Sequence, residues 1–119
     1  MKHLLLTTIA AVVLLGCGES SIHYAAYSGN IEAVKQHLAD GADVNAKNEN
    51  DMTALHFAAH EVHREMIELL IAKGADVNAK TDAGETPLDN AIKYKRTETA
   101  DVLRTHGGKT GEELKATGN

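Results

Sequence analysis

Aromatic residues are scarce in this 119-residue chain, which has three tyrosines, one phenylalanine and no tryptophan. A core must therefore be built mainly from Ala, Leu, Ile and Val, which favours closely packed helices over an aromatic-rich β-sandwich. The only cysteine, Cys17, excludes an internal disulfide. A formal net charge of −5 makes nucleic acid an unfavourable partner, because like charges repel each other. These absences leave one small domain, for which we predict no nucleic-acid partner.

Short catalytic motifs are absent as well: there is no G-x-S-x-G, no glycine-rich phosphate loop and no paired-cysteine zinc motif. His56, His60 and His63 are spaced by four and three residues, so two or three imidazoles could meet at a metal ion. The segment from His60 to His63 nevertheless lacks the two-residue spacer of the HExxH metalloprotease motif. We predict no enzyme and no catalytic, cofactor or metal site. A metal-dependent enzyme using these three histidines is the alternative.

Long hydrophobic runs are also missing, apart from one near the start of the chain. Residues 4–15 are apolar except for Thr7 and Thr8. Twelve residues are too few for a comfortable membrane span, which takes roughly 20. The run has the length of the apolar region of a secretory signal peptide, and Lys2 supplies the positive start of such a peptide.

The segment Leu14-Leu15-Gly16-Cys17 at the end of this run resembles the lipobox of bacterial lipoproteins. The resemblance implies that residues 1–16 are a cleaved signal peptide and that Cys17 carries lipid. The protein would then be exported and anchored on the extracytoplasmic side of a membrane, in the periplasm or at the cell surface. Two alternatives remain: cleavage after Gly18 would give a soluble secreted protein, and residues 4–15 could be a buried first helix.

A seven-residue pattern occurs twice in this chain. GADVNAK stands at positions 41–47 and returns at positions 74–80, so the residue number advances by 33. A fixed period of this length indicates a repeat architecture in which one unit stacks on the next. The same step links His23, His56 and Asp89; Ser20, Thr53 and Thr86; Ala25, Ala58 and Ala91; and Gly41, Gly74 and Gly107. Three copies are therefore predicted near 18–50, 51–83 and 84–108.

Each copy has the signals of two helices. Thr53 is a suitable N-cap for a short helix over residues 54–59, and Thr86-Pro87 gives the third copy an N-cap followed by proline at the first helical position. A second helix is indicated by apolar residues on one face, namely Met66, Ile67, Leu70 and Ile71. Gly74 is expected to end that helix in the left-handed conformation.

The Thr53–His56 segment, the TPLD segment Thr86–Asp89 and the GADVN pattern together resemble the ankyrin repeat. The resemblance covers about residues 18–108. It implies an all-α solenoid of helix-turn-helix units with projecting turns, and a structural role for His56 in bridging neighbouring repeats. Ankyrin units usually carry glycine where this chain has Asp51, Val62 and Lys95. Because a β-branched residue resists a positive φ, we predict either local strain at Val62 or a reshaped turn between the helices of the second copy. If φ is positive at Val62, Val62→Gly is expected to raise the thermal midpoint.

The two ends of the array have the composition of caps. Polar Gln36 and His37 stand in the first copy where the second has leucines. In the C-terminal segment, residues 109–119, Thr110 and Glu113 form a capping-box pattern. We predict a small C-terminal capping helix through Leu114, which could cover the apolar edge of the last repeat.

The resemblance also implies function, because the family binds proteins through its turn tips and the concave face of its first helices. We predict a monomeric, non-catalytic protein-binding module, with an inhibitor or immunity-type protein against a secreted enzyme or toxin as the alternative. The small basic cluster of Lys93, Lys95 and Arg96 is interpreted as a solvated helix end. The predicted partner-facing residues are Tyr27, Lys47, Glu49, Asn50, Met52, His60, Glu61, Lys80, Asp82, Glu85, Lys93 and Tyr94.

Overall fold

The computed structural model describes residues 21–61 and 63–117, and every regular element in this part is a helix. The helices are α2 (Ile22–Ser28), α3 (Ile31–Ala39), α4 (Ala54–His60), α5 (Arg64–Ala72), α6 (Pro87–Lys93), α7 (Thr97–Thr105) and α8 (Gly111–Ala116). None of them, within these described ranges, is long and apolar enough to cross a membrane.

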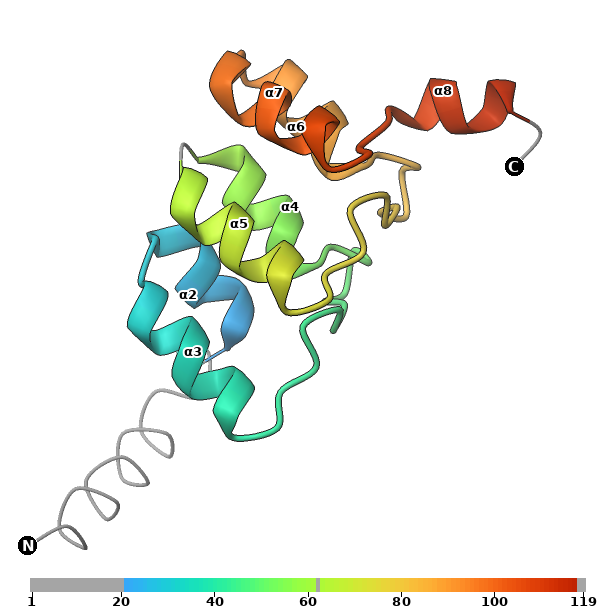
Figure 1. Ribbon diagram of the computed structural model, residues 1–119. Helices are drawn as coiled ribbons and strands as arrows, with labels where there is room; N and C mark the ends of the chain where they lie inside the picture. The colour runs from blue at the N-terminus through green and yellow to red at the C-terminus, as the bar shows by residue number, and fades with distance from the viewer. Residues whose placement is uncertain (1–20, 62, 118–119) are drawn as a thin grey trace, which may run out of the picture.

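The helices pair as α2–α3, α4–α5 and α6–α7, and the three pairs stack in chain order (Figure 1). Extended loops on one side connect each pair to the next, while α8 lies to the side of the last pair. The predicted all-α solenoid of helix-turn-helix units with projecting turns and a short C-terminal helix is therefore confirmed.

The end of each second helix follows from its glycine. Helices α3, α5 and α7 end at equivalent positions of the period, namely Ala39, Ala72 and Thr105. Shortly after these ends, Gly41, Gly74 and Gly107 adopt φ values of 98°, 99° and 88°. Only glycine reaches this left-handed conformation without steric cost from a Cβ atom, so these residues stop the helix and turn the chain. The expectation for Gly74 is confirmed.

Two other left-handed positions are not occupied by glycine. Asp51 has φ 62° and Lys95 has φ 58°. The matching residue of another copy is glycine in both cases: Gly84 corresponds to Asp51 and has φ 79°, and Gly29 corresponds to Lys95 and has φ 78°. The chain thus carries a side chain at two positions where that conformation costs about 1 kcal/mol or more. Val62, the third position expected to be strained, lies outside the described residues.

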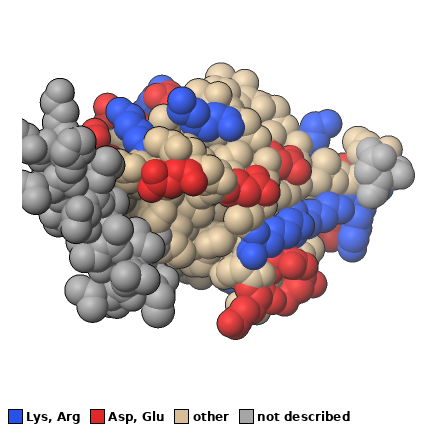
Figure 2. Space-filling view, turned by 90° about the horizontal axis from the view of Figure 1, so that it is seen from below, with Lys and Arg blue, Asp and Glu red and all other residues tan. Residues whose placement is uncertain are grey.

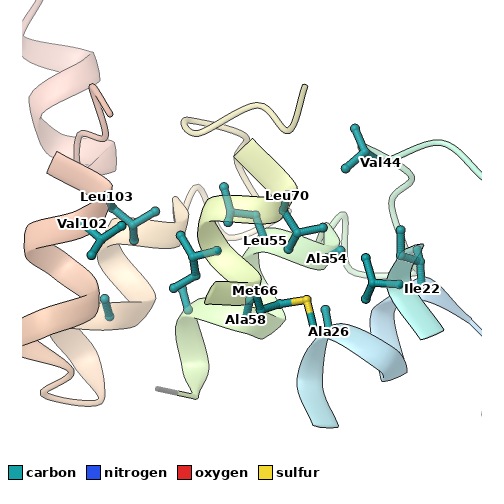
Figure 3. Packing of buried hydrophobic residues seen from close by; sticks show 14 of the residues in the cluster. Ile22, Ala26, Val44, Ala54, Leu55, Ala58, Met66, Leu70, Val102 and Leu103 are labelled. Carbon is teal, nitrogen blue, oxygen red and sulfur yellow. The ribbon is translucent and has the colours of Figure 1, made fainter. Parts of the chain in front are cut away.

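The core is built from small and branched aliphatic side chains, as the composition indicates. Larger residues such as Leu55, Leu70 and Leu103 are fully buried. Alanines fill the space where helices of neighbouring repeats approach closely, and the Met66 side chain reaches toward Ala26 of the preceding repeat (Figure 3). Burial of this apolar surface, at about 25 cal/mol per Å², provides the main stabilisation of the stack.

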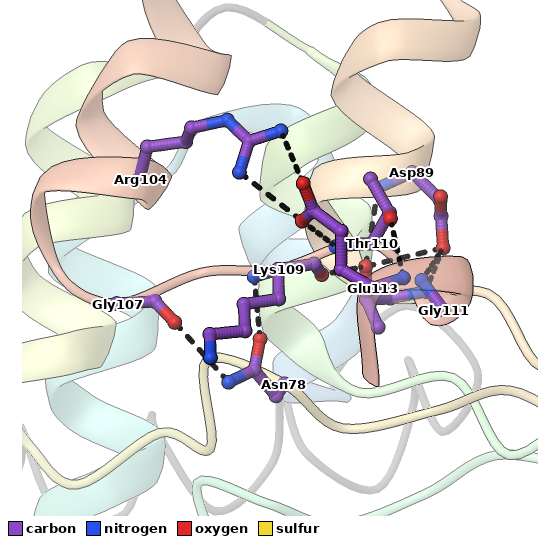
Figure 4. Close-up of polar contacts among 9 residues, drawn as sticks. Asn78, Asp89, Arg104, Gly107, Lys109, Thr110, Gly111 and Glu113 are labelled. Atoms are coloured by element: carbon purple, nitrogen blue, oxygen red, sulfur yellow. Dashed lines mark hydrogen bonds and ion pairs between the residues drawn. The ribbon is translucent and has the colours of Figure 1, made fainter. Parts of the chain in front are cut away.

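The asparagine of the GADVN pattern joins consecutive repeats. The Asn45 amide accepts a hydrogen bond from the Asp76 backbone N–H at 2.7 Å and donates one to the Gly74 carbonyl at 3.1 Å. One period later, Asn78 accepts from the Lys109 N–H at 2.7 Å and donates to the Gly107 carbonyl at 3.2 Å (Figure 4). Each amide satisfies a donor and an acceptor of the following loop, which explains why this residue recurs in the pattern.

Helix α8 is held by polar contacts around its first turn. Thr110 and Glu113 form the expected capping box, and Arg104 pairs with both Glu113 carboxylate oxygens at 3.1 and 3.2 Å (Figure 4). The Asp89 carboxylate accepts a hydrogen bond from the Gly111 N–H at 2.8 Å. Leu114 is half-buried, and no described residue of α8 is fully buried.

Candidate partner-binding surface

His56 joins the second and third repeats from inside the stack. Its Nδ1 lies 3.0 Å from the Thr53 backbone nitrogen, which donates to it, so Nε2 carries the proton and donates to the Glu85 carbonyl at 3.0 Å. The side chain has no exposed surface. Burial lowers the pKa of His56 below its ordinary value of 6.5, although the hydrogen bond to Glu85 opposes this effect. The structural role implied for His56 is confirmed, and both ring nitrogens are occupied.

The three histidines that could have formed a metal site have separate surroundings. His56 is buried, and His63 approaches the Tyr27 carbonyl of the preceding repeat with Nε2 at 3.3 Å. His60 lies beside Glu61, with 2.7 Å between Nδ1 and the carboxylate. Across the described residues, no group of three His, Cys, Asp or Glu side chains is placed to hold a metal ion.

Aromatic and imidazole rings instead form a row along the first helices, which we call the ring row: His23, Phe57, Tyr27, His60 and Tyr94. The His23 and Phe57 centroids are 5.7 Å apart, and those of Phe57 and Tyr27 are 6.4 Å apart. His60 lies 5.8 Å from Tyr27 and 4.0 Å from Tyr94. The first three separations are typical of interacting rings, and the contact between His60 and Tyr94 is closer still. The row is therefore continuous from the first repeat to the third.

The ring row is accessible to solvent. Tyr27 is 44% exposed and Tyr94 is 41% exposed, while His23, Phe57 and His60 are half-buried. At the first-repeat end, a hollow of about 310 Å³ is lined by Ser21, His23, Tyr24, Tyr27 and Phe57. The row therefore presents apolar ring faces and polar tips on one side of the stack, which is the composition that protein interfaces favour.

None of the predicted partner-facing residues is buried. Seven of them are exposed, namely Tyr27, Lys47, Glu49, Asn50, Asp82, Lys93 and Tyr94. The other five are half-buried, namely Met52, His60, Glu61, Lys80 and Glu85. The structure brings Tyr27, His60 and Tyr94 together in the ring row. The two loop tips are joined by a hydrogen bond from the Asp82 N–H to the Asn50 carbonyl at 3.0 Å.

Charged groups around the ring row are mixed in sign. The Lys93 ammonium is 3.8 Å from the Glu85 carboxylate and 5.8 Å from the Tyr94 ring centroid. Figure 2 shows both acidic and basic side chains on the described part of the face that it draws, rather than a block of one sign. Ring contacts, more than long-range charge, thus characterise the candidate surface.

Two members of the ring row and one neighbour are missing from the residues that the sequence predicts at the surface. His23 and Phe57 belong to the row, and Tyr24 beside it is 50% exposed. A signal for them is present in the register, because Phe57 stands one period after Tyr24 and His60 stands one period after Tyr27. The 33-residue period gives the position of each ring along the chain, but it does not say in which direction the side chain points.

A comparison with known families agrees with this geometry. The family model described as "Ankyrin repeats (3 copies)" matches residues 22–113. No curated protein matches the chain.

Proposed function

Because this chain belongs to the ankyrin repeat family, we propose that it is a non-catalytic module that binds a partner protein through the ring row and the adjacent loop tips. The family generally mediates protein–protein interaction, and the observation that carries the proposal is the continuous row of five rings across three repeats. Tyrosine provides a large contact area with a polar tip, and exposed rings of this kind act as anchors in interfaces.

Replacing Tyr27, Met52 and Tyr94 together by alanine is expected to weaken partner binding at least about tenfold, because interface anchors each contribute more than about 1 kcal/mol. Crosslinking pull-down from intact membranes, with quantified recovery of one partner protein, measures this loss. The matched control replaces Lys35, Glu65 and Asp101 by alanine, since these exposed residues lie on the second helices. Equal recovery with both triple variants would reject the ring row as the binding surface.

We further propose that lipid on Cys17 anchors the module to a bacterial membrane. The support is the lipobox-like segment at residues 14–17, which lies outside the described residues. The three residues from Cys17 to Ser20 span at most about 11 Å, so the repeats would lie close to the membrane surface. More than one acyl chain gives a stable anchor, whereas a single chain is marginal.

Mass spectrometry of the mature N-terminus tests the anchor, and we expect acyl mass on Cys17 together with loss of residues 1–16. Cys17→Ser is then expected to move the protein from the membrane fraction to the soluble fraction. A mature chain that begins after Gly18 would indicate secretion without lipid. An intact N-terminus would indicate that residues 4–15 belong to the fold.

The second candidate is an inhibitor or immunity-type protein against a secreted enzyme or toxin. Its support is the acidic charge, which becomes −6 when removal of residues 1–16 takes Lys2 from the −5 of the whole chain. Such a charge steers the protein toward a basic enzyme. A toxin gene encoded beside this one, whose product loses activity on binding the purified chain, would favour this candidate over a scaffold.

A further inference from the structure

The last repeat presents a groove on the side that faces away from the rest of the stack. It runs between α6 and α7, has a volume of about 430 Å³ and is lined by Ala91, Ile92, Lys95, Arg96, Thr97 and Ala100. We call it the edge groove. None of these residues belongs to the ring row, so the edge groove is a separate surface.

The same surface is covered in the first two repeats. Ala26 and Ala59, which correspond to Ile92, have no exposed surface, but Ile92 is 51% exposed. Val34 and Ile67, which correspond to Ala100, are also fully buried, whereas Ala100 is only half-buried. In those repeats the helices of the next repeat provide the cover. The edge groove therefore has the shape of a place where a further helix packs.

Helix α8 does not fill this place. Its first turn is fastened beside the start of α6 through Gly111 and Asp89, but the helix then extends to the side of the stack (Figure 1). No residue of α8 lines the edge groove. A larger side chain stands at position 92 than at the two equivalent positions, which increases the apolar surface left uncovered.

The charge of the edge groove is opposite to that of the protein. Lys95 and Arg96 are its only charged lining residues, whereas the chain carries −5. The nearby carboxylate of Glu98 is directed toward Arg64 of the preceding repeat, at 3.7 Å. Lys95 is moreover held at φ 58°, where Gly29 stands in the first repeat, and strained side chains of this kind concentrate at functional sites.

We propose that the edge groove binds an acidic amphipathic helix of a partner protein, in the place that the first helix of a fourth repeat would take. The apolar stripe of that helix covers Ile92 and Ala100. Its Asp or Glu side chains pair with Lys95 and with the terminal nitrogens of Arg96, whose Nε donates to the His60 carbonyl of the preceding repeat at 3.1 Å. We infer a helix because helices of the next repeat cover Ala26 and Ala59 in the first two repeats. We infer an acidic partner because the charged residues that line the groove, Lys95 and Arg96, are both cations. This surface goes beyond the proposed function, because it does not involve Tyr27, Met52 or Tyr94.

Two synthetic helical peptides of about 12 residues, close to the mean helix length, test the proposal. They share an alanine and leucine stripe and differ only in carrying glutamate or lysine beside it. Fluorescence anisotropy with the full chain is expected to show at least about tenfold tighter binding of the acidic peptide at low salt, with the preference reduced as salt screens the charges. Equal binding of both peptides, or binding of neither, would overturn the proposal.

Lys95→Gly separates this role from stability. The variant should raise the thermal midpoint, because glycine adopts the left-handed conformation freely, while it weakens binding of the acidic peptide at least about threefold. Asp51→Gly is the matched control, with φ 62° at a site outside the groove, and it should raise the midpoint with unchanged affinity. Unchanged affinity in Lys95→Gly would contradict the proposal.

Ile92→Ala, which restores the residue found at the two equivalent positions, is expected to fold normally and to weaken the acidic peptide as well. The Tyr27 and Met52 substitutions should leave the affinity for this peptide unchanged, so failure here and failure of the ring row can be told apart. Sedimentation of the free chain tests whether a second copy of the chain, rather than a partner helix, occupies the groove. A dimer that disappears in Ile92→Ala would show that a second copy, and not an acidic helix, covers the groove.

Discussion

Replacing His56 by alanine is expected to lower the free energy of unfolding by about 3 kcal/mol. The substitution removes two hydrogen bonds, each contributing about 1 kcal/mol, and leaves the Thr53 N–H and the Glu85 carbonyl without the partner that satisfies them in the folded state. It also leaves a cavity where a fully buried ring stood. Because small domains have only about 5–15 kcal/mol of stability in total, this is a large fraction.

His23→Ala is the matched control, since His23 occupies the same place in the first repeat. It is half-buried, and its Nε2 makes one hydrogen bond, to the Ala46 carbonyl at 2.8 Å. We expect a loss of about 1 kcal/mol, which is typical of a single hydrogen bond. Urea unfolding of both variants measures the difference, and similar losses would show that His56 does not join the repeats more strongly than His23 does.

Mild acid is expected to destabilise the protein through the same residue. The pKa of His56 is lowered in the folded state by burial, so the unfolded chain binds a proton more readily. The stabilisation is therefore fully present above pH 6.5, the ordinary pKa of histidine, and is lost as pH falls from 6.5 toward the lower folded-state pKa. Within that window the free energy of unfolding falls by up to about 1.4 kcal/mol per pH unit.

Thermal midpoints measured from pH 7.5 to pH 5 test this loss. His56→Asn is the control, because the asparagine oxygen can still accept from the Thr53 N–H but does not titrate. The slope should be steeper in the wild type than in this variant. The hydrogen bond to Arg104 holds the pKa of the Glu113 carboxyl below 4.5. The pH series stops at pH 5, so that protonation of Glu113 does not contribute to the measured loss of stability. Parallel curves for the two proteins would show that another group controls the acid response.

Those parts of the fold that depend on local sequence could be predicted. The N-caps at Thr53 and Thr86 and the turn at Gly74 are determined by residues next to one another in the chain, and the repeat period can be read directly from the recurrence of GADVNAK. The role of Asn45 could not be read in the same way, although it lies in the most obvious pattern of the sequence. Its partners Gly74 and Asp76 are 29 and 31 residues away, and only the stacking of two repeats brings them within hydrogen-bond distance.

The candidate surface could be predicted only in part. The sequence predicts Tyr27 and Tyr94 at the surface, and both are exposed. That Phe57 and His23 connect them in one row depends on side-chain directions across two interfaces, which no local pattern contains. The exposure of Ile92 could not be predicted either, because the register suggests a small buried residue and the capping box of α8 does not determine where that helix lies relative to α6.

The bridges made by Asn45 and Asn78 have a consequence for the time course of folding. Among the described residues these bridges fasten each repeat to the next one, so each spans 31 residues and none connects the first repeat to the third. Chains without longer-range contacts have a lower contact order and fold more rapidly. The middle repeat has a neighbour on both sides, whereas the outer two have one each. Amide hydrogens of α4 and α5 should accordingly exchange with solvent most slowly, while opening fluctuations begin at the two ends.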